Sequence, residues 1–313
     1  MDLTIITPVF NAEKFIEETV FSLLSIVDGT NIEYLIVDDG STDTTLNILK
    51  GIEGNFTILE KSNGGEASAV NFGLSKATGD YIMIVNADDP LIGAPLLVEK
   101  SLNILKAHPE IVVVYPDWRM IDVTGKTLKH ISTLDYKRSI LINKAKCLPG
   151  PGAVFRGNFA KAVGGRSAKW RYVGDFDFWL RLSSFGDFYR IPEELASWRS
   201  HEGSLTTSGA GRLMAAENVE VMNEFIQNRN ISNSDCREAV ANANLNAALI
   251  GLTTNKIFVQ KYLLGCIRNR PSSLFRIRLR TVFFLLFHPI SFYLRGFLVK
   301  VNNWFQQSIL RKE

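Results

Sequence analysis

The stretch YIMIVNADDP, residues 81–90, joins a short apolar run to a cluster of amide and acidic side chains. Its first five residues are all hydrophobic, which is typical of a strand buried on both faces of a sheet. The adjacent carboxylates of Asp88 and Asp89 follow at once. Carboxylates at the end of a buried strand are costly unless a cation compensates them, and their oxygens suit Mg²⁺ or Mn²⁺. Taken alone, an Asp-Asp pair is more often a solvated turn or a helix N-cap.

The same succession of an apolar run and a polar cluster recurs through the first 115 residues. We expect strands over residues 3–9, 33–37, 56–60, 81–85 and 111–115. Apolar residues at helical spacing favour helices between these strands, and Asn11 is expected to cap the first helix. Strands this apolar, separated by helices, predict an α/β fold with a parallel sheet covered on both faces.

Three polar clusters, at residues 38–43, 63–66 and 86–89, each follow a predicted strand. Ligands of such sheets bind beyond the carboxyl ends of the strands, so the sequence places the clusters around one crevice. Asp39 would face this crevice and accept N–H bonds from a nucleobase or ribose. Asp43 would cap the helix that follows.

Composition narrows the class of protein. The 313 residues are 46% hydrophobic and 21% charged, which excludes a disordered or collagen-like chain. Cys147, Cys236 and Cys266 form no CxxC pair, which argues against a disulfide scaffold or a thiolate zinc site and suits a reducing compartment. The N-terminus shows no secretory signal, so we expect a cytoplasmic protein.

Charge is distributed unevenly along the chain. Residues 251–313 carry 11 Lys or Arg and one acid, whereas the first 250 residues carry 24 basic and 31 acidic side chains. The acidic body argues against nucleic-acid binding. The basic, aromatic residues 268–313 predict peripheral contact with anionic lipid at the inner face of the cell membrane, because the apolar run 281–294 is too short to span it. The alternative is helices that pack on the catalytic domain or on a second subunit of a homo-oligomer.

Six ordered motifs resemble those of the family 2 glycosyltransferases. They are TPVFN at residues 7–11, VDDGSTD at 37–43, NGG at 63–65, NADD at 86–89, YVGDFDFWLRL at 172–182 and WRSHEGSLT at 198–206. The resemblance covers about residues 3–210. It implies the glycosyltransferase A-type fold, a Rossmann-like, mostly parallel sheet with flanking helices. The expected domains are a catalytic domain over 1–210, divided near 117 into nucleotide-binding and acceptor parts, and a helical region over 211–313.

The resemblance also implies roles for individual residues. The nucleotide would contact Thr7, Pro8, Val9, Asn11, Asp39, Asn63, Asn71 and Asp88. Asp89 would ligate a Mg²⁺ or Mn²⁺ ion that Asp88 assists, and His201 would lie near this ion or the diphosphate. Asp175 matches the catalytic base. Arg199, Gly152 and Trp179 would lie near the diphosphate or acceptor.

Some residues depart from the family pattern or have a structural alternative. Gly174 replaces the usual acid before the base, and Asn86 replaces an aspartate, which removes one negative charge from the metal site. Phe10 replaces a tyrosine and so deletes a hydroxyl near the base. The helical spacing of Trp179 favours a place in the core. Arg181 is expected to neutralise an internal carboxylate, with Asp177 as the candidate partner.

The predicted activity is inverting transfer of a hexosyl or N-acetylhexosaminyl group. The donor would be a nucleotide sugar, most simply a UDP-sugar, and the acceptor a hydroxyl group of a glycan or lipid-linked molecule in cell-surface polysaccharide synthesis. Because the resemblance supplies one base and no nucleophile partner, direct displacement is expected. The alternatives are a sugar-phosphate nucleotidyltransferase and a catalytically inactive nucleotide-sugar-binding protein.

Overall fold

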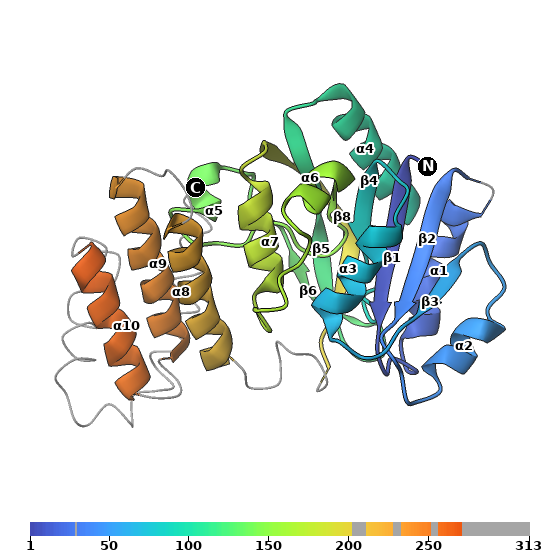
Figure 1. The fold of residues 1–313 in the computed structure, drawn as a ribbon, viewed down its shortest axis with the longest axis horizontal. Helices are drawn as coiled ribbons and strands as arrows, with labels where there is room; N and C mark the ends of the chain where they lie inside the picture. Colours follow the sequence, from blue (N-terminus) through green and yellow to red (C-terminus); the bar gives the residue numbers. More distant parts are fainter. Residues whose placement is uncertain (29, 202–210, 228–232, 252–255, 271–313) are drawn as a thin grey trace. The chain divides into compact units, whose positions relative to one another are not determined.

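The computed structural model describes the chain except residues 29, 202–210, 228–232, 252–255 and 271–313 (Figure 1). The chain divides into two compact units. The first contains residues 1–141 and 146–208, and the second contains residues 142–145 and 209–313. Each unit is described below by itself.

The first unit is built on one mixed sheet. Among the described residues its strands are β1 (Leu3–Val9), β2 (Ile32–Asp38), β3 (Thr57–Glu60), β4 (Tyr81–Ile84), β5 (Ile111–Ile121), β6 (Thr127–Ile131), β7 (Val154–Arg156) and β8 (Asp187–Arg199). The strand order is β3-β2-β1-β4-β7-β5-β6, and β8 pairs with β5. Strands β3, β2, β1 and β4 are mutually parallel, and β8 runs parallel to β5, whereas β6 and β7 run antiparallel to their neighbours.

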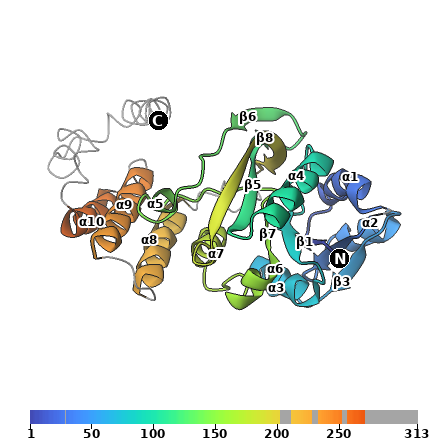
Figure 2. The same ribbon diagram turned by 90° about the horizontal axis from the view of Figure 1, so that it is seen from above.

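Helices cover both faces of this sheet. They are α1 (Ile16–Val27), α2 (Thr45–Gly51), α3 (Glu66–Lys76), α4 (Ala94–Ala107), α5 (Arg138–Leu141), α6 (Gly157–Ala162) and α7 (Gly174–Leu182). Figure 2 shows α1 and α4 on one side of β1 and α3 on the other. Helix α3 lies close to strand β1 at Gly73, where a Cβ atom would lie 2.6 Å from Cγ2 of Ile6.

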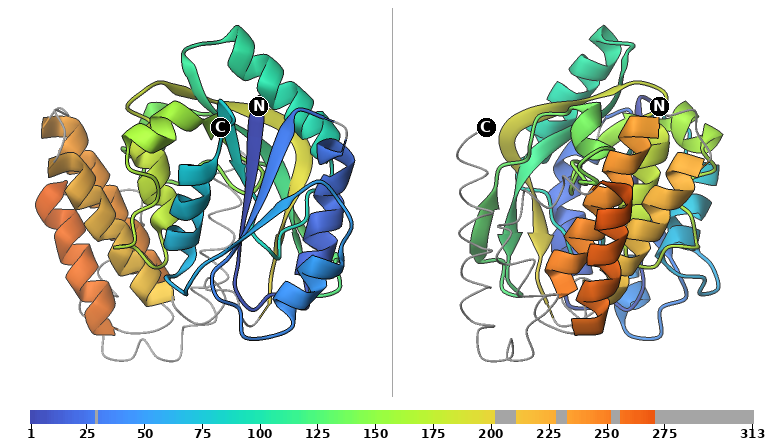
Figure 3. Two further views of the ribbon diagram at one scale, coloured as in Figure 1. Left: turned by 45° about the vertical axis from the view of Figure 1, so that its right-hand side comes forward. Right: turned by 90° about the vertical axis from the view of Figure 1, so that its left-hand side faces the viewer.

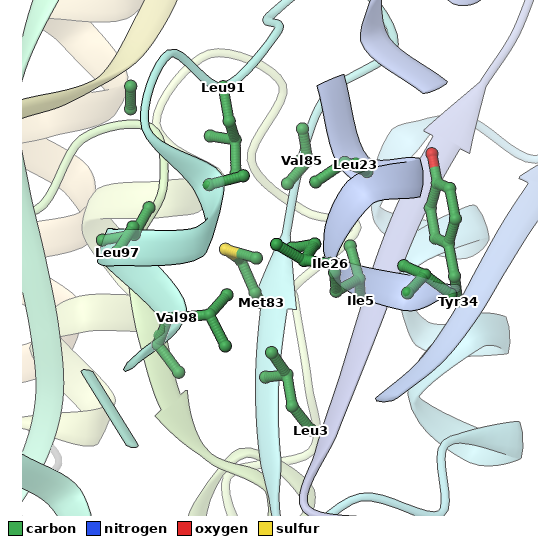
Figure 4. Close-up of a cluster of buried hydrophobic side chains, with 14 of the residues drawn as sticks. Leu3, Ile5, Leu23, Ile26, Tyr34, Met83, Val85, Leu91, Leu97 and Val98 are labelled. Atoms are coloured by element: carbon green, nitrogen blue, oxygen red, sulfur yellow. The ribbon is translucent and has the colours of Figure 1, made fainter. Parts of the chain in front are cut away.

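The main core lies between α1, α4 and one face of the central strands. Leu3 and Ile5 of β1 and Met83 of β4 point toward Leu23 of α1 and Leu97 of α4 (Figure 4). All five side chains are fully buried. Because alternate residues of a strand face opposite sides, Ile6 packs on the α3 face instead, and β1 is buried along its whole length.

The parallel register brings the polar clusters to one edge, as predicted. Val9 at the end of β1 lies beside Asp38 at the end of β2, which lies beside Glu60 at the end of β3. The loops that follow these strands and β4 therefore start at the same edge of the sheet. The predicted α/β fold with a mostly parallel sheet is confirmed in this half of the unit.

Two expectations were wrong in detail. Asn11 does not cap α1, because the helix begins at Ile16 with Phe15 at the N-cap position, and Asn11 instead adopts a left-handed backbone with φ 51°. The expected boundary near residue 117 falls inside β5. Strand β7 inserts between β4 and β5, so one sheet joins the predicted nucleotide-binding and acceptor parts.

The second unit contains α8 (Gly211–Gln227), α9 (Asn233–Gly251) and α10 (Lys256–Asn269), which lie side by side with α9 in the middle (Figure 3). Asparagines of α9 hold the segment 142–145: Asn242 donates to the carbonyl of Asn143 at 2.6 Å, and Asn246 donates to that of Lys144 at 3.2 Å. None of the described helices is long and apolar enough to cross a membrane. The predicted membrane contact at 268–313 falls almost entirely outside the described residues.

Candidate active site

Asn11 links the ends of β1 and β2. Its side-chain oxygen accepts a hydrogen bond from the backbone N–H of Thr42 at 2.8 Å, and its own N–H donates to Ser41 Oγ at 3.0 Å. Asparagine tolerates the left-handed conformation that this exposed turn requires. The predicted nucleotide residue Asn11 thus follows the carboxyl end of β1. Its hydrogen bonds fix the loop that follows β2.

Thr7, Pro8 and Val9, which the resemblance places at the nucleotide, are buried in β1. Thr7 Oγ1 lies 3.2 Å from the hydroxyl of Tyr34, and Val9 belongs to the core. Burial raises the pKa of this tyrosine, so the pair remains a neutral hydrogen bond. The side chains of these three residues are therefore part of the buried interior at the carboxyl end of β1.

The carboxylate of Asp39 is turned toward the loop that follows β3. It accepts hydrogen bonds from the N–H groups of Gly64 at 3.0 Å and Gly65 at 2.7 Å, and it pairs with Lys61 Nζ at 2.5 Å. Asp39 is 2% exposed. In this structure it holds residues 61–65 in place, which brings the exposed Asn63 to the same edge. The sequence motif gave no sign of its partner Lys61.

Asn71, a predicted nucleotide residue, is bound to the chain segment that follows α6. Its amide group forms two reciprocal bonds with the backbone of Arg166: Nδ2 donates to the carbonyl and Oδ1 accepts from the N–H, both at 2.8 Å. Both ends of the amide are therefore used to attach residue 166 to α3.

Asp88 and His201 face each other after β4 and β8. His201 Nε2 lies 2.8 Å from Asp88 Oδ2, and the two side chains are 19% and 28% exposed. A carboxylate oxygen suits Mn²⁺ or Mg²⁺, whereas an imidazole nitrogen is a more usual ligand of softer divalent ions. Within the described residues, no group of three or more His, Cys, Asp or Glu could enclose a metal ion.

The structure argues against Asp89 as the main metal ligand. Asp89 is 2% exposed, and its two oxygens accept hydrogen bonds from the Arg199 N–H at 2.8 Å and from Asn86 Nδ2 at 3.0 Å. Burial, and then the charge of Asp88, raises the pKa of Asp89 well above its usual value. With both oxygens already accepting hydrogen bonds, Asp89 is less accessible to an ion than the partly exposed Asp88.

Arg199, which the resemblance places near the diphosphate or acceptor, is fully buried. Its guanidinium donates to the carbonyls of Asp88 at 2.9 Å and Asp122 at 3.0 Å, and to the carboxylate of Glu18 at 2.6 Å. The group also lies over the ring of Phe15, 5.0 Å from its centre. Arg199 thereby joins the end of β8 to α1 and to the acidic loop.

The predicted base, Asp175, lies in the first turn of α7 with 57% of its side chain exposed. Its Oδ1 forms an ion pair with Arg166, and Oδ2 has no hydrogen bond among the described residues. Asp177, two residues on, is instead held by Arg181 on the same helix at 2.6 Å, as predicted. Asp175 is therefore the more accessible proton acceptor of the two.

Two further predicted site residues belong to the packing. Trp179 is 4% exposed and stacks edge-on against Phe155, which confirms the core alternative. Gly152 has φ 77°, and a Cβ there would lie 3.0 Å from Leu97 Cδ2 and from Ala196 Cβ.

Comparison with known proteins agrees with this architecture. The chain matches Glycosyl transferase family 2 over residues 4–162. It is 27% identical over 220 residues to an uncharacterized glycosyltransferase of Rickettsia typhi, an alignment that covers 67% of this chain and 68% of the relative. The sheet, its flanking helices and this match define a glycosyltransferase with the A-type fold. The chain belongs to glycosyltransferase family 2.

Two solved structures share this fold. S. aureus TarS 1-349 in complex with UDP-GlcNAc has a TM-score of 0.54 and 18% identity, covering 88% of this chain and 92% of TarS. The mannosyltransferase PcManGT from Pyrobaculum calidifontis, in complex with GDP-Man and Mn²⁺, has a TM-score of 0.56 and 17% identity, covering 99% and 88%.

We predict that Arg199→Lys destabilises the first unit by about 3–5 kcal/mol, because a lysine cannot reach all three acceptors and leaves buried polar groups unpaired. Urea unfolding measures the change. The matched control is Arg119→Lys on β5, whose side chain is 30% exposed beside Glu194 and should cost about 0–1 kcal/mol. Equal, small losses in both variants would contradict the account of Arg199.

Proposed function

We propose that this glycosyltransferase transfers a sugar from a UDP-sugar to a hydroxyl group of a glycan or lipid-linked acceptor, with inversion at the anomeric carbon. The observation that carries the proposal is the exposed carboxylate of Asp175 in the first turn of α7, whose Oδ1 is paired with Arg166. Direct displacement requires one such base and no second nucleophile. The complexes of TarS with UDP-GlcNAc and of PcManGT with GDP-Man support a nucleotide-sugar donor.

The chain's own groups divide the chemistry. Asp175 takes the proton of the acceptor hydroxyl as its oxygen attacks the anomeric carbon from the face opposite the leaving nucleoside diphosphate. Asn11, Asp39 and the loop 61–65 shape the end of the sheet where the nucleotide binds. A divalent cation held by Asp88 and His201 would, when bound, stabilise the charge on the departing diphosphate.

Nucleotide binding tests this function directly. We expect UDP with Mn²⁺ to raise the melting temperature of the full chain more than GDP or CMP does, and EDTA to remove the effect. Release of UDP from a panel of UDP-sugars then identifies the donor. Pyrophosphate release from UTP and a sugar 1-phosphate would instead support the nucleotidyltransferase alternative. Binding of UDP without any transfer would support the inactive binding protein.

A pair of isosteric variants tests which carboxylate binds the metal. Asp88→Asn should weaken Mn²⁺-dependent UDP binding roughly 10-fold or more, because it removes a charged ligand. Asp89→Asn should keep most of this binding, because the amide oxygen can still accept the Arg199 N–H. Calorimetric titration of UDP with Mn²⁺ and with EDTA measures both. The reverse order of effects would return the metal to Asp89.

A further inference from the structure

The segment that follows α6, residues 164–166, holds Arg166 in a fixed backbone position. Gly164 and Gly165 both have positive φ, at 79° and 69°. A Cβ on Gly165 would lie 2.2 Å from Asn71 Oδ1, so only glycine fits there. The two hydrogen bonds between Asn71 and the backbone of Arg166 then fix residue 166 against α3. The local structure thus fixes the backbone position from which the Arg166 side chain extends.

The Arg166 side chain connects two helices. It is 8% exposed, and its terminal nitrogen NH1 contacts Glu66 Oε1 at 2.7 Å as well as Oδ1 of Asp175. Glu66 is the first residue of α3, and Asp175 lies in the first turn of α7. One nitrogen therefore serves two carboxylates that come from different elements.

This arrangement is not one that stability alone would favour. Arg166 Nε is buried without a hydrogen-bond partner among the described residues, so the guanidinium is taken out of water with its donors incompletely used. Its compensation comes from two carboxylates that are themselves largely exposed, Glu66 at 47% and Asp175 at 57%. The thiol of Cys147, an exposed side chain, is a further titratable neighbour of the guanidinium.

We propose, on the basis of the function proposed above, that Arg166 is the positioning residue of the catalytic base. It holds Oδ1 of Asp175 so that Oδ2 faces the acceptor. Glu66 shares the same nitrogen. The N-terminus of α3, directly after the loop that Asp39 holds, is in this way tied to the base.

The proposal predicts a loss in kcat rather than in donor affinity. In Arg166→Gln, kcat should fall roughly 10- to 100-fold through misplacement of the base, while the KM for the donor stays near the wild-type value. In Arg166→Lys, which keeps the positive charge but not the planar group, kcat should recover only in part. In Glu66→Gln, kcat should fall less than in Arg166→Gln, because the contact between Arg166 and Asp175 remains.

The matched control is Arg181→Gln, which breaks an arginine–aspartate pair on the same helix without touching the base. Its kcat should stay within a few-fold of the wild-type value. Mn²⁺-dependent UDP affinity should be unchanged in every variant, which separates an effect on the base from one on the donor. A kcat of Arg166→Gln within a few-fold of the wild type would overturn the role of Arg166. A wild-type chain that transfers no sugar would instead contradict the proposed function itself.

Discussion

The buried guanidinium of Arg199 is the interaction on which the acidic end of the sheet depends. Asp88 and Asp89 stand together after a buried strand, where their charges are costly. Arg199 stabilises this pair with both its backbone and its side chain. Its backbone N–H donates to the carboxylate of Asp89, and its guanidinium donates to the backbone carbonyl of Asp88 and to the carboxylate of Glu18 on α1. Because Arg199 binds Asp89 and the backbone of Asp88, the side chain of Asp88 lies toward His201, with Oδ2 2.8 Å from Nε2.

Other aspartates of the first unit are also paired with a basic side chain. Asp39 is paired with Lys61, Asp175 with Arg166 and Asp177 with Arg181. Within the part of the chain that the structure describes, Asp88 differs because its side-chain partner is an imidazole rather than a permanent cation. A carboxylate whose partner can itself act as a ligand keeps the capacity to bind an ion. The carboxylate of Asp39, by contrast, fixes a loop, and Asp175 is the proposed proton acceptor.

The sequence predicted the parts of this arrangement that are local. Apolar runs identified the strands β1 to β4, and the motifs identified the loops that follow them, because strand ends in a parallel sheet meet at one edge. Side-chain partners could not be predicted in the same way. Asn71 binds a backbone 95 residues further along the chain, and nothing in the spacing of either segment indicates it. Arg166 follows a Gly-Gly turn, a signal for loop conformation that says nothing about the carboxylates the side chain reaches.

The central claim is that Asp175 is the proton acceptor, and the rate of sugar transfer in Asp175→Asn tests it most directly. The measurement is a single-turnover rate at saturating donor, compared with Asp177→Asn under conditions where both variants are folded. We predict a fall of about 10²–10⁴-fold for Asp175→Asn with unchanged affinity for UDP, and a rate near that of the wild type for Asp177→Asn. Transfer by Asp175→Asn within a few-fold of the wild type would contradict the account.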